Sequence, residues 1–258
     1  MTPKACVAAV LLVAAAPTGA MAQTFPSNAG DLKVETVARG LSNPWAIAFL
    51  PDGTLLVTER PGRLRIVARD GTLSPPVAGV PAVRGSGQGG LHDVVLDRDF
   101  ARNRTIYFCF AEAAQGGGRT AMARARLTDD ATPKLDGVKV IFRQEGPLSS
   151  GNHYGCRIVQ GRDGNLFLTM GDHYSARDDA QNLANHIGKI VRVTPDGEVP
   201  KDNPFVARKD ARAEIWSYGH RNAQGLAVNP ASGKAFSRVF MTRCPRHRCR
   251  LCGKRCVA

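Results

Sequence analysis

The feature that most constrains this fold is a repeated unit in which two apolar, strand-like segments flank a tight turn. Residues 47–58 read Ile-Ala-Phe-Leu-Pro-Asp-Gly-Thr-Leu-Leu-Val-Thr, and residues 158–169 have the same form around a second Asp-Gly. A looser copy spans 94–108, and a fourth begins at 226–233, where Ser-Gly occupies the turn. Because Asp-Gly and Ser-Gly supply the positive-φ residues of hairpin turns, we expect an all-β fold.

The spacing of these turns predicts a β-propeller. They recur at intervals of roughly 50 to 70 residues, the size of a four-stranded blade with its loops. Further strand pairs follow the first hairpins, for example at 62–67 and 188–193, and no later segment has the periodicity of a capped helix. The partial propeller is expected over 23–236, with room for about three to four blades, fewer than a closed ring needs.

Residues 1–22 have the pattern of a signal peptide. Lys4 precedes an apolar run at 5–16, and Ala20-Met-Ala22 is a small-x-small cleavage site. The run is short for a bilayer, and no later stretch is apolar over the ~20 residues that a spanning helix needs. We therefore expect a periplasmic or secreted protein without a stable membrane span; an uncleaved anchor is the alternative.

The positive charge does not indicate nucleic-acid binding. Of the formal net charge of +13, seven charges lie in residues 237–258, which contain no acidic residue, and this leaves +6 for the rest. That remainder has no Lys/Arg stripe interleaved with aromatic residues, so we expect no nucleic-acid partner.

The six cysteines that follow the signal-peptide pattern fall into two groups. Cys109 and Cys156 are each flanked by strand-like sequence, and we expect them to be buried apolar side chains rather than a disulfide, because pairing does not follow from sequence alone. Four others crowd the basic segment 237–258, at Cys244, Cys249, Cys252 and Cys256.

Four glycine-rich segments carry the polar residues from which a site could be built: 85–93, 151–157, 171–174 and 217–225. In a propeller, loops at one end of the blades converge on the central channel, so distant segments can share a site. Considered singly each segment is weak evidence, since a histidine in a glycine-rich turn is more often structural. Four histidines have no spacing that indicates zinc, and we expect them to be structural: His92, His173, His186 and His220.

Within these segments His153 is the candidate general base, because the pKa of a histidine lies near the working pH. Asp172 is the candidate acceptor that orients its imidazole. Arg221 is a fixed cation suited to a developing oxyanion, and Gln88 and Asn222 can hydrogen-bond carbonyls or hydroxyls of a ligand.

Several short motifs, taken in order along the chain, complete the pattern. They are Asn43-Pro-Trp45, Thr58-Glu-Arg60, Gly87-Gln-Gly-Gly-Leu91, His153 with Arg157, Gly171-Asp172, Asn185-His-Ile-Gly-Lys189, Asp202-Asn-Pro-Phe205 and Glu214-Ile-Trp-Ser-Tyr-Gly-His-Arg-Asn222. The ordered set resembles the PQQ-dependent aldose sugar dehydrogenases, the soluble glucose/sorbosone dehydrogenase family, over about residues 32–236.

The resemblance implies a specific chemistry. Members are six-bladed propellers that bind pyrroloquinoline quinone (PQQ) and calcium on the axis and oxidise the C1 hydroxyl of an aldose, for an external electron acceptor. By position His153 matches the base and Asp172 its orienting carboxylate. Arg221 matches the residue beside the quinone oxygens, and Gln88 and Asn222 match cofactor or substrate contacts. No residue of this chain is assigned to the metal.

After residue 236 the sequence departs from the family. The segment 237–258 lacks the acidic, His- and Gly-rich pattern whose carbonyls hold calcium in the family, so we expect activity to be impaired. Its cysteines could bind zinc. A shifted reading frame in a GC-rich gene also yields Arg, Cys, Pro and Gly without acidic residues, and we favour that interpretation.

Two other functions fit the repeats. A non-catalytic propeller could present its axial face to a protein or a glycan, but it would not need His153, Asp172 and Arg221 together. A lactonase-type propeller would need a carboxylate-rich metal site, and the motifs contain none.

Overall fold

The computed structural model describes residues 23–239, apart from 116, 147 and 149. The expected signal peptide and the cysteines of the basic segment lie outside the described residues. The described chain is all-β, as predicted, and its helical elements are the one-turn helix α1 (Phe100–Asn103) and the 3₁₀ turn η1 (Arg177–Gln181).

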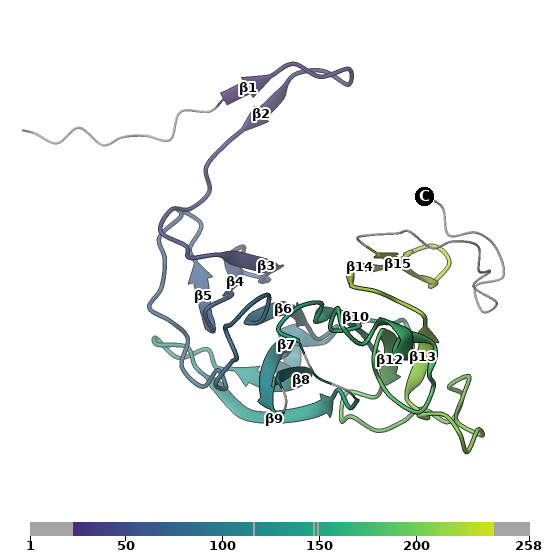
Figure 1. Ribbon diagram of the computed structural model, residues 1–258. Helices are drawn as coiled ribbons and strands as arrows, with labels where there is room; N and C mark the ends of the chain where they lie inside the picture. The colour runs from purple at the N-terminus through teal and green to yellow at the C-terminus, as the bar shows by residue number, and fades with distance from the viewer. Residues whose placement is uncertain (1–22, 116, 147, 149, 240–258) are drawn as a thin grey trace, which may run out of the picture.

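The strands form consecutive antiparallel sheets that pair in chain order. The first is a two-stranded ribbon, β1 (Gln23–Phe25) with β2 (Leu32–Val34), which stands apart from the others (Figure 1). The second sheet contains β3 (Pro44–Phe49), β4 (Leu55–Glu59) and β5 (Arg63–Val67). We call it blade 1.

Two four-stranded sheets and a hairpin follow. Blade 2 contains β6 (Leu91–Leu96), β7 (Thr105–Ala114), β8 (Gly117–Leu127) and β9 (Leu135–Arg143). Blade 3 contains β10 (Gly155–Gln160), β11 (Leu166–Met170), β12 (Lys189–Val193) and β13 (Ile215–Tyr218). The last pair is β14 (Ala223–Val228) with β15 (Ala235–Val239). The sheets follow one another in an arc (Figure 1), the arrangement of a partial propeller.

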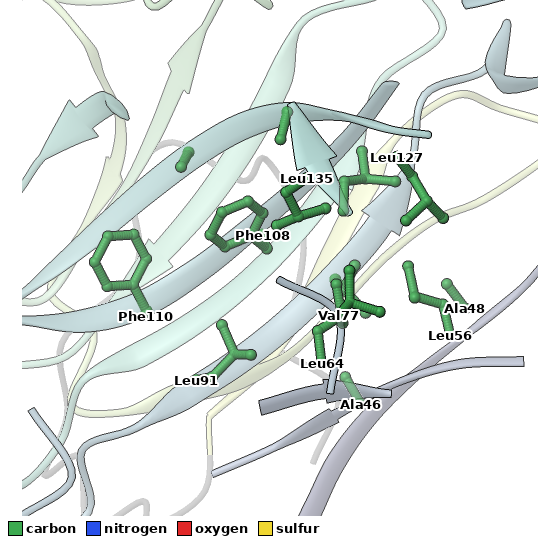
Figure 2. Close-up of a cluster of buried hydrophobic side chains, with 14 of the residues drawn as sticks. Ala46, Ala48, Leu56, Leu64, Val77, Leu91, Phe108, Phe110, Leu127 and Leu135 are labelled. Atoms are coloured by element: carbon green, nitrogen blue, oxygen red, sulfur yellow. The ribbon is translucent and has the colours of Figure 1, made fainter. Parts of the chain in front are cut away.

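The hydrophobic core lies between neighbouring sheets. Side chains of blades 1 and 2 meet in a layer that includes Leu56, Leu64, Leu91 and Phe108 (Figure 2). A second layer between blades 2 and 3 includes Tyr107, and a third, smaller one joins blade 3 to β14. Each blade is thus stabilised by its neighbours, which explains why one strand-turn-strand unit recurs along the sequence.

The first strand of blades 1, 2 and 3 and of the last pair begins with an irregularity. The register shifts at the start of β3, β6, β10 and β14, next to the loop that enters the strand. Such bulges free a backbone N–H from the ladder and change the direction of the chain.

A buried threonine satisfies the freed N–H in two of these strands. Thr58 Oγ1 accepts the Ala46 N–H at 3.0 Å and donates to a carbonyl of β6. Thr169 Oγ1 accepts the Arg157 N–H at 2.9 Å and donates to the Ala223 carbonyl at 2.6 Å. Both threonines are fully buried, and each is the last residue of a predicted repeat unit. The repeated threonine therefore links one blade to the next.

Asp93 links blades 2 and 3. Its Oδ2 accepts the Ile158 N–H at 2.7 Å, and its Oδ1 accepts from Arg157 Nη1 at 3.1 Å and from the Val94 N–H at 3.0 Å. Burial raises the pKa of this carboxyl to about 6, although the hydrogen bonds and the Arg157 charge act in the opposite direction.

Cys109 of β7 and Cys156 of β10 form a disulfide, with their Cα atoms 5.8 Å apart. The prediction of two separate apolar side chains was therefore wrong about pairing, although both residues are fully buried. The packing of blade 2 against blade 3 brings the two strands together, and a separation of 47 residues gives no sequence signal of that contact.

We expect Thr169→Val to lower the free energy of unfolding by about 2 kcal/mol or more, because it leaves a buried N–H and a buried carbonyl without partners. Thr169→Ser keeps the hydroxyl and is the matched control, with a smaller loss. Urea unfolding measures both variants. Equal losses for Val and Ser would show that the hydroxyl does not link the blades.

We also expect the stability difference between wild type and Asp93→Asn to depend on pH. A carboxyl whose pKa is raised in the folded state stabilises it below the unfolded pKa, and that contribution is lost as pH rises through about 6. Acidification from pH 7 to pH 4 should therefore favour wild type over the variant by up to about 3 kcal/mol. Urea unfolding at several pH values tests this, and a constant difference would contradict it.

Candidate active site

Four loops far apart in sequence meet at the entry to the bulged strands. The loop before β6 carries Gln88, the loop before β10 carries His153, and the turn before β14 carries Arg221 and Asn222. Asp172 comes from the segment that follows β11. Hydrogen bonds and one ion pair connect Gln88, His153, Asp172 and Arg221, and Asn222 binds the His153 loop through Gly155. The structure thus brings the whole predicted set together.

The centre of the site is a buried histidine–aspartate pair. His153 Nδ1 lies 2.7 Å from Asp172 Oδ1, and the two side chains are 7% and 0% exposed. Asp172 Oδ1 also accepts the Tyr174 N–H at 2.8 Å, which fixes the carboxylate further. Because a carboxylate can only accept, it selects the tautomer with the proton on Nδ1. His153 Nε2 makes no hydrogen bond within the described residues and is left as an acceptor.

Arg221 completes a charged cluster around Asp172. Its Nε lies 2.9 Å from Asp172 Oδ2, and its side chain is 32% exposed. The angle of this contact is not that of a hydrogen bond, so Oδ2 is a buried carboxylate oxygen that no donor of the described chain satisfies. The backbone reinforces the cluster, because the Asp172 N–H donates to the Arg221 carbonyl at 2.8 Å.

Gln88 and Asn222 both hold the loop that carries His153. Gln88 Oε1 accepts the His153 N–H at 2.9 Å, and Asn222 Oδ1 accepts the Gly155 N–H at 3.0 Å. Gln88 is exposed and Asn222 is buried. Neither side-chain amide nitrogen makes a hydrogen bond within the described residues, so each is a donor that a ligand could use.

Tyr174 is a site residue to which sequence reasoning gave no role. Its ring meets His153 edge-on at 5.3 Å between centroids, and the Arg221 guanidinium lies 5.9 Å from its centroid. The side chain is nevertheless 59% exposed. The available signal was its place two residues after Asp172 in the Gly-Asp-His-Tyr segment, but no periodicity shows that an aromatic ring turns back over a neighbouring loop.

The backbone of the site is held in unfavourable conformations. Six described non-glycine residues have left-handed φ. Three of them lie in these loops, at His153, His173 and Tyr174, and a fourth, Cys156, lies at the start of β10. Such residues cost of order 1 kcal/mol or more each and cluster at functional sites.

Gly171 allows the two central loops to approach closely. A Cβ at this position would overlap with the carbonyl oxygen of His153.

The other four histidines of residues 23–239 have partners inside the protein. His173 Nε2 lies 2.8 Å from Gln144 Oε1, and burial lowers the pKa of His173. Burial also lowers the pKa of His92 and of His220 to about 4, and His186 Nε2 lies 2.6 Å from Glu214 Oε1. In the described ranges no three His, Cys, Asp or Glu residues are grouped closely enough to hold a metal ion.

The sequence profile of the Glucose / Sorbosone dehydrogenase family matches residues 41–239. The chain belongs to this family. It is 47% identical over 203 residues to the aldose sugar dehydrogenase YliI of Escherichia coli, a match that covers 78% of this chain and 54% of the relative. The predicted family is therefore confirmed, and the chain spans about half the length of this curated relative.

Solved structures agree. The apo form of the soluble aldose sugar dehydrogenase from Escherichia coli superimposes with a TM-score of 0.77 at 44% identity, covering 81% of this chain and 60% of that one. The PQQ-bound aldose sugar dehydrogenase from Streptomyces coelicolor has a TM-score of 0.68 at 31% identity, with coverages of 86% and 61%. Among the described elements, no helix has the length and apolar character to cross a membrane.

We expect Gly171→Ala to separate the two central loops and to destabilise the chain by about 2 kcal/mol or more, because backbone rather than a flexible side chain opposes the added methyl. Gly151→Ala is the matched control, since its Cβ would meet ordinary contacts of 3.7 Å or longer. Thermal and urea unfolding compare the two. A Gly171 variant as stable as the Gly151 variant would contradict the close approach.

Proposed function

We propose that this chain carries the base and the cation of a PQQ-dependent aldose dehydrogenase, which oxidises a sugar at its C1 hydroxyl and passes electrons to an external acceptor. The observation that supports it most is that one buried carboxylate, Asp172, holds both His153 and Arg221. A non-catalytic propeller would not require this arrangement, and no observation favours that alternative.

The residues divide the reaction between them. His153 Nε2 is the atom that accepts the proton of the C1 hydroxyl, because Nδ1 is occupied by Asp172. Asp172 holds the ring in place and stabilises the imidazolium that forms. The fixed positive charge of Arg221 stabilises negative charge on oxygen atoms beside it. PQQ, when bound, supplies the quinone that accepts the hydride.

The described residues fit part of a PQQ site. Within the described residues the Arg221 guanidinium has an ion pair with Asp172 and a ring contact with Tyr174 and no other polar side-chain partner, and the amide of exposed Gln88 has free N–H donors. These donors suit the carbonyl and carboxylate oxygens of the cofactor, and the exposed Tyr174 ring offers a flat surface beside them. The described residues offer no cluster for calcium, and no step is assigned to that ion.

We also propose that the protein functions in the periplasm or outside the cell. The disulfide between Cys109 and Cys156 supports this, because such bonds persist in oxidising compartments. The signal segment that predicts export lies outside the described residues.

The test is glucose-dependent reduction of an artificial dye by the chain supplied with PQQ and calcium. We expect weak activity, because segment 237–258 departs from the family, but activity above that of the PQQ-free sample. We also expect a loss of about 10²-fold or more in kcat for His153→Ala, the size of a general-base contribution. Asp172→Asn should also lower kcat, because an amide no longer enforces the tautomer. Asp178→Asn, a matched change at a side chain that is 98% exposed, should leave kcat unchanged.

Two results would count against the enzyme. One is the absence of any glucose-dependent reduction above the PQQ-free sample. The other is activity that survives His153→Ala. PQQ binding, followed by its absorbance, shows whether an inactive variant has lost the base or the cofactor.

A further inference from the structure

The disulfide lies at the base of the loop that carries His153. Cys156 has a left-handed φ of 69° and sits inside the bulge of β10, where the register shifts between Gly155 and Ile158. Its partner, Cys109, is in the middle of β7, a long regular strand of blade 2. The bond therefore joins the irregular start of one blade to a rigid strand of its neighbour.

The short segment between the disulfide and the base has little freedom. The Gly155 N–H donates to Asn222 Oδ1, and the Tyr154 carbonyl accepts a hydrogen bond from Thr120 Oγ1 at 2.7 Å. His153 itself has a left-handed φ of 52°. Residues 153–156 include two non-glycine residues with left-handed φ, His153 and Cys156, which hydrogen bonds alone would otherwise hold. A covalent link here therefore has a direct effect on where His153 lies.

The disulfide is specific to the strand that follows the base. The bulge of β3 is held by the hydroxyl of Thr58, and the bulge of β10 has the equivalent bond from Thr169. Only the second of these two strands carries a cross-link in addition. Core packing alone does not explain why β10 has a disulfide and β3 has none, since both strands pack against a neighbouring sheet.

We propose that the Cys109–Cys156 disulfide is a positioning element for His153, and that the His153–Asp172 pair assembles fully only when the bond is formed. The geometric part of this inference stands without the proposed function, and only its effect on turnover rests on it. Forming the bond removes two protons and two electrons from the thiols, and an external disulfide accepts them by exchange and becomes a dithiol.

The test follows the His153–Asp172 hydrogen bond by NMR in the complete chain, with ¹⁵N-labelled histidine. Oxidised wild type should show a downfield Nδ1–H signal, assigned by its loss in His153→Gln. The double variant Cys109→Ala/Cys156→Ala should lose or broaden this signal. In the PQQ-loaded protein, kcat should fall by about 100-fold, the effect of displacing a catalytic group by about 1 Å.

Leu64→Ala is the matched control for simple loss of stability. It opens a cavity between blades 1 and 2, away from β10, and should keep the downfield signal while lowering the unfolding midpoint. As a second route that needs no variant, dithiothreitol should remove the signal from folded wild type, and reoxidation should restore it. Peptide mapping without reductant identifies the Cys109–Cys156 linkage in the starting protein.

Three results would overturn the inference: free thiols at both positions in the native chain, a downfield signal that persists in the double variant or after reduction, or its equal loss in Leu64→Ala. The proposed function fails separately. If the signal depends on the disulfide but no sugar is oxidised, the positioning role stands and the dehydrogenase proposal falls.

Discussion

The structure depends on the bulged start of the first strand in blades 1, 2 and 3 and in the last strand pair. At these points the ladder is interrupted, the chain turns, and the entering loop is directed toward its neighbours in the adjacent sheets. A freed N–H would be costly in a buried position, and the threonines at the ends of the repeat units satisfy it while bonding the next blade. The bulged strand start with its threonine hydroxyl thus joins the blades and places the loops that carry the site.

Within the site, Asp172 joins the separate loops, as the threonines join the blades. Burial of a carboxylate costs free energy unless its oxygens are paired. Asp172 is paired by the imidazole of His153, the N–H of Tyr174 and the charge of Arg221. These groups come from separate loops, which only the packing of the blades brings together. Fold and site are therefore coupled, because a change that loosens the contact between blades also separates the groups around this carboxylate.

Much of this could be predicted from local sequence. The Asp-Gly turns at Gly53 and Gly164 adopt left-handed φ as their sequences indicate, and the recurrence of the unit predicted the blades. The set of His153, Asp172 and Arg221 followed from the ordered motifs. The disulfide and the contacts of Tyr174 could not be predicted, because each depends on how two sheets or two loops approach one another. Sequence spacing carries no signal of that approach.

The energetics show why the site needs a propeller around it. The left-handed residues of the site loops raise the free energy of the folded chain. The compensation comes from the apolar layers between sheets, whose side chains are almost fully removed from water. These layers lie on both sides of blade 2, and the disulfide crosses the second of them, next to the loop of His153. The strained backbone beside His153 is thus anchored to a buried apolar layer, which supports a catalytic side chain carried by a loop.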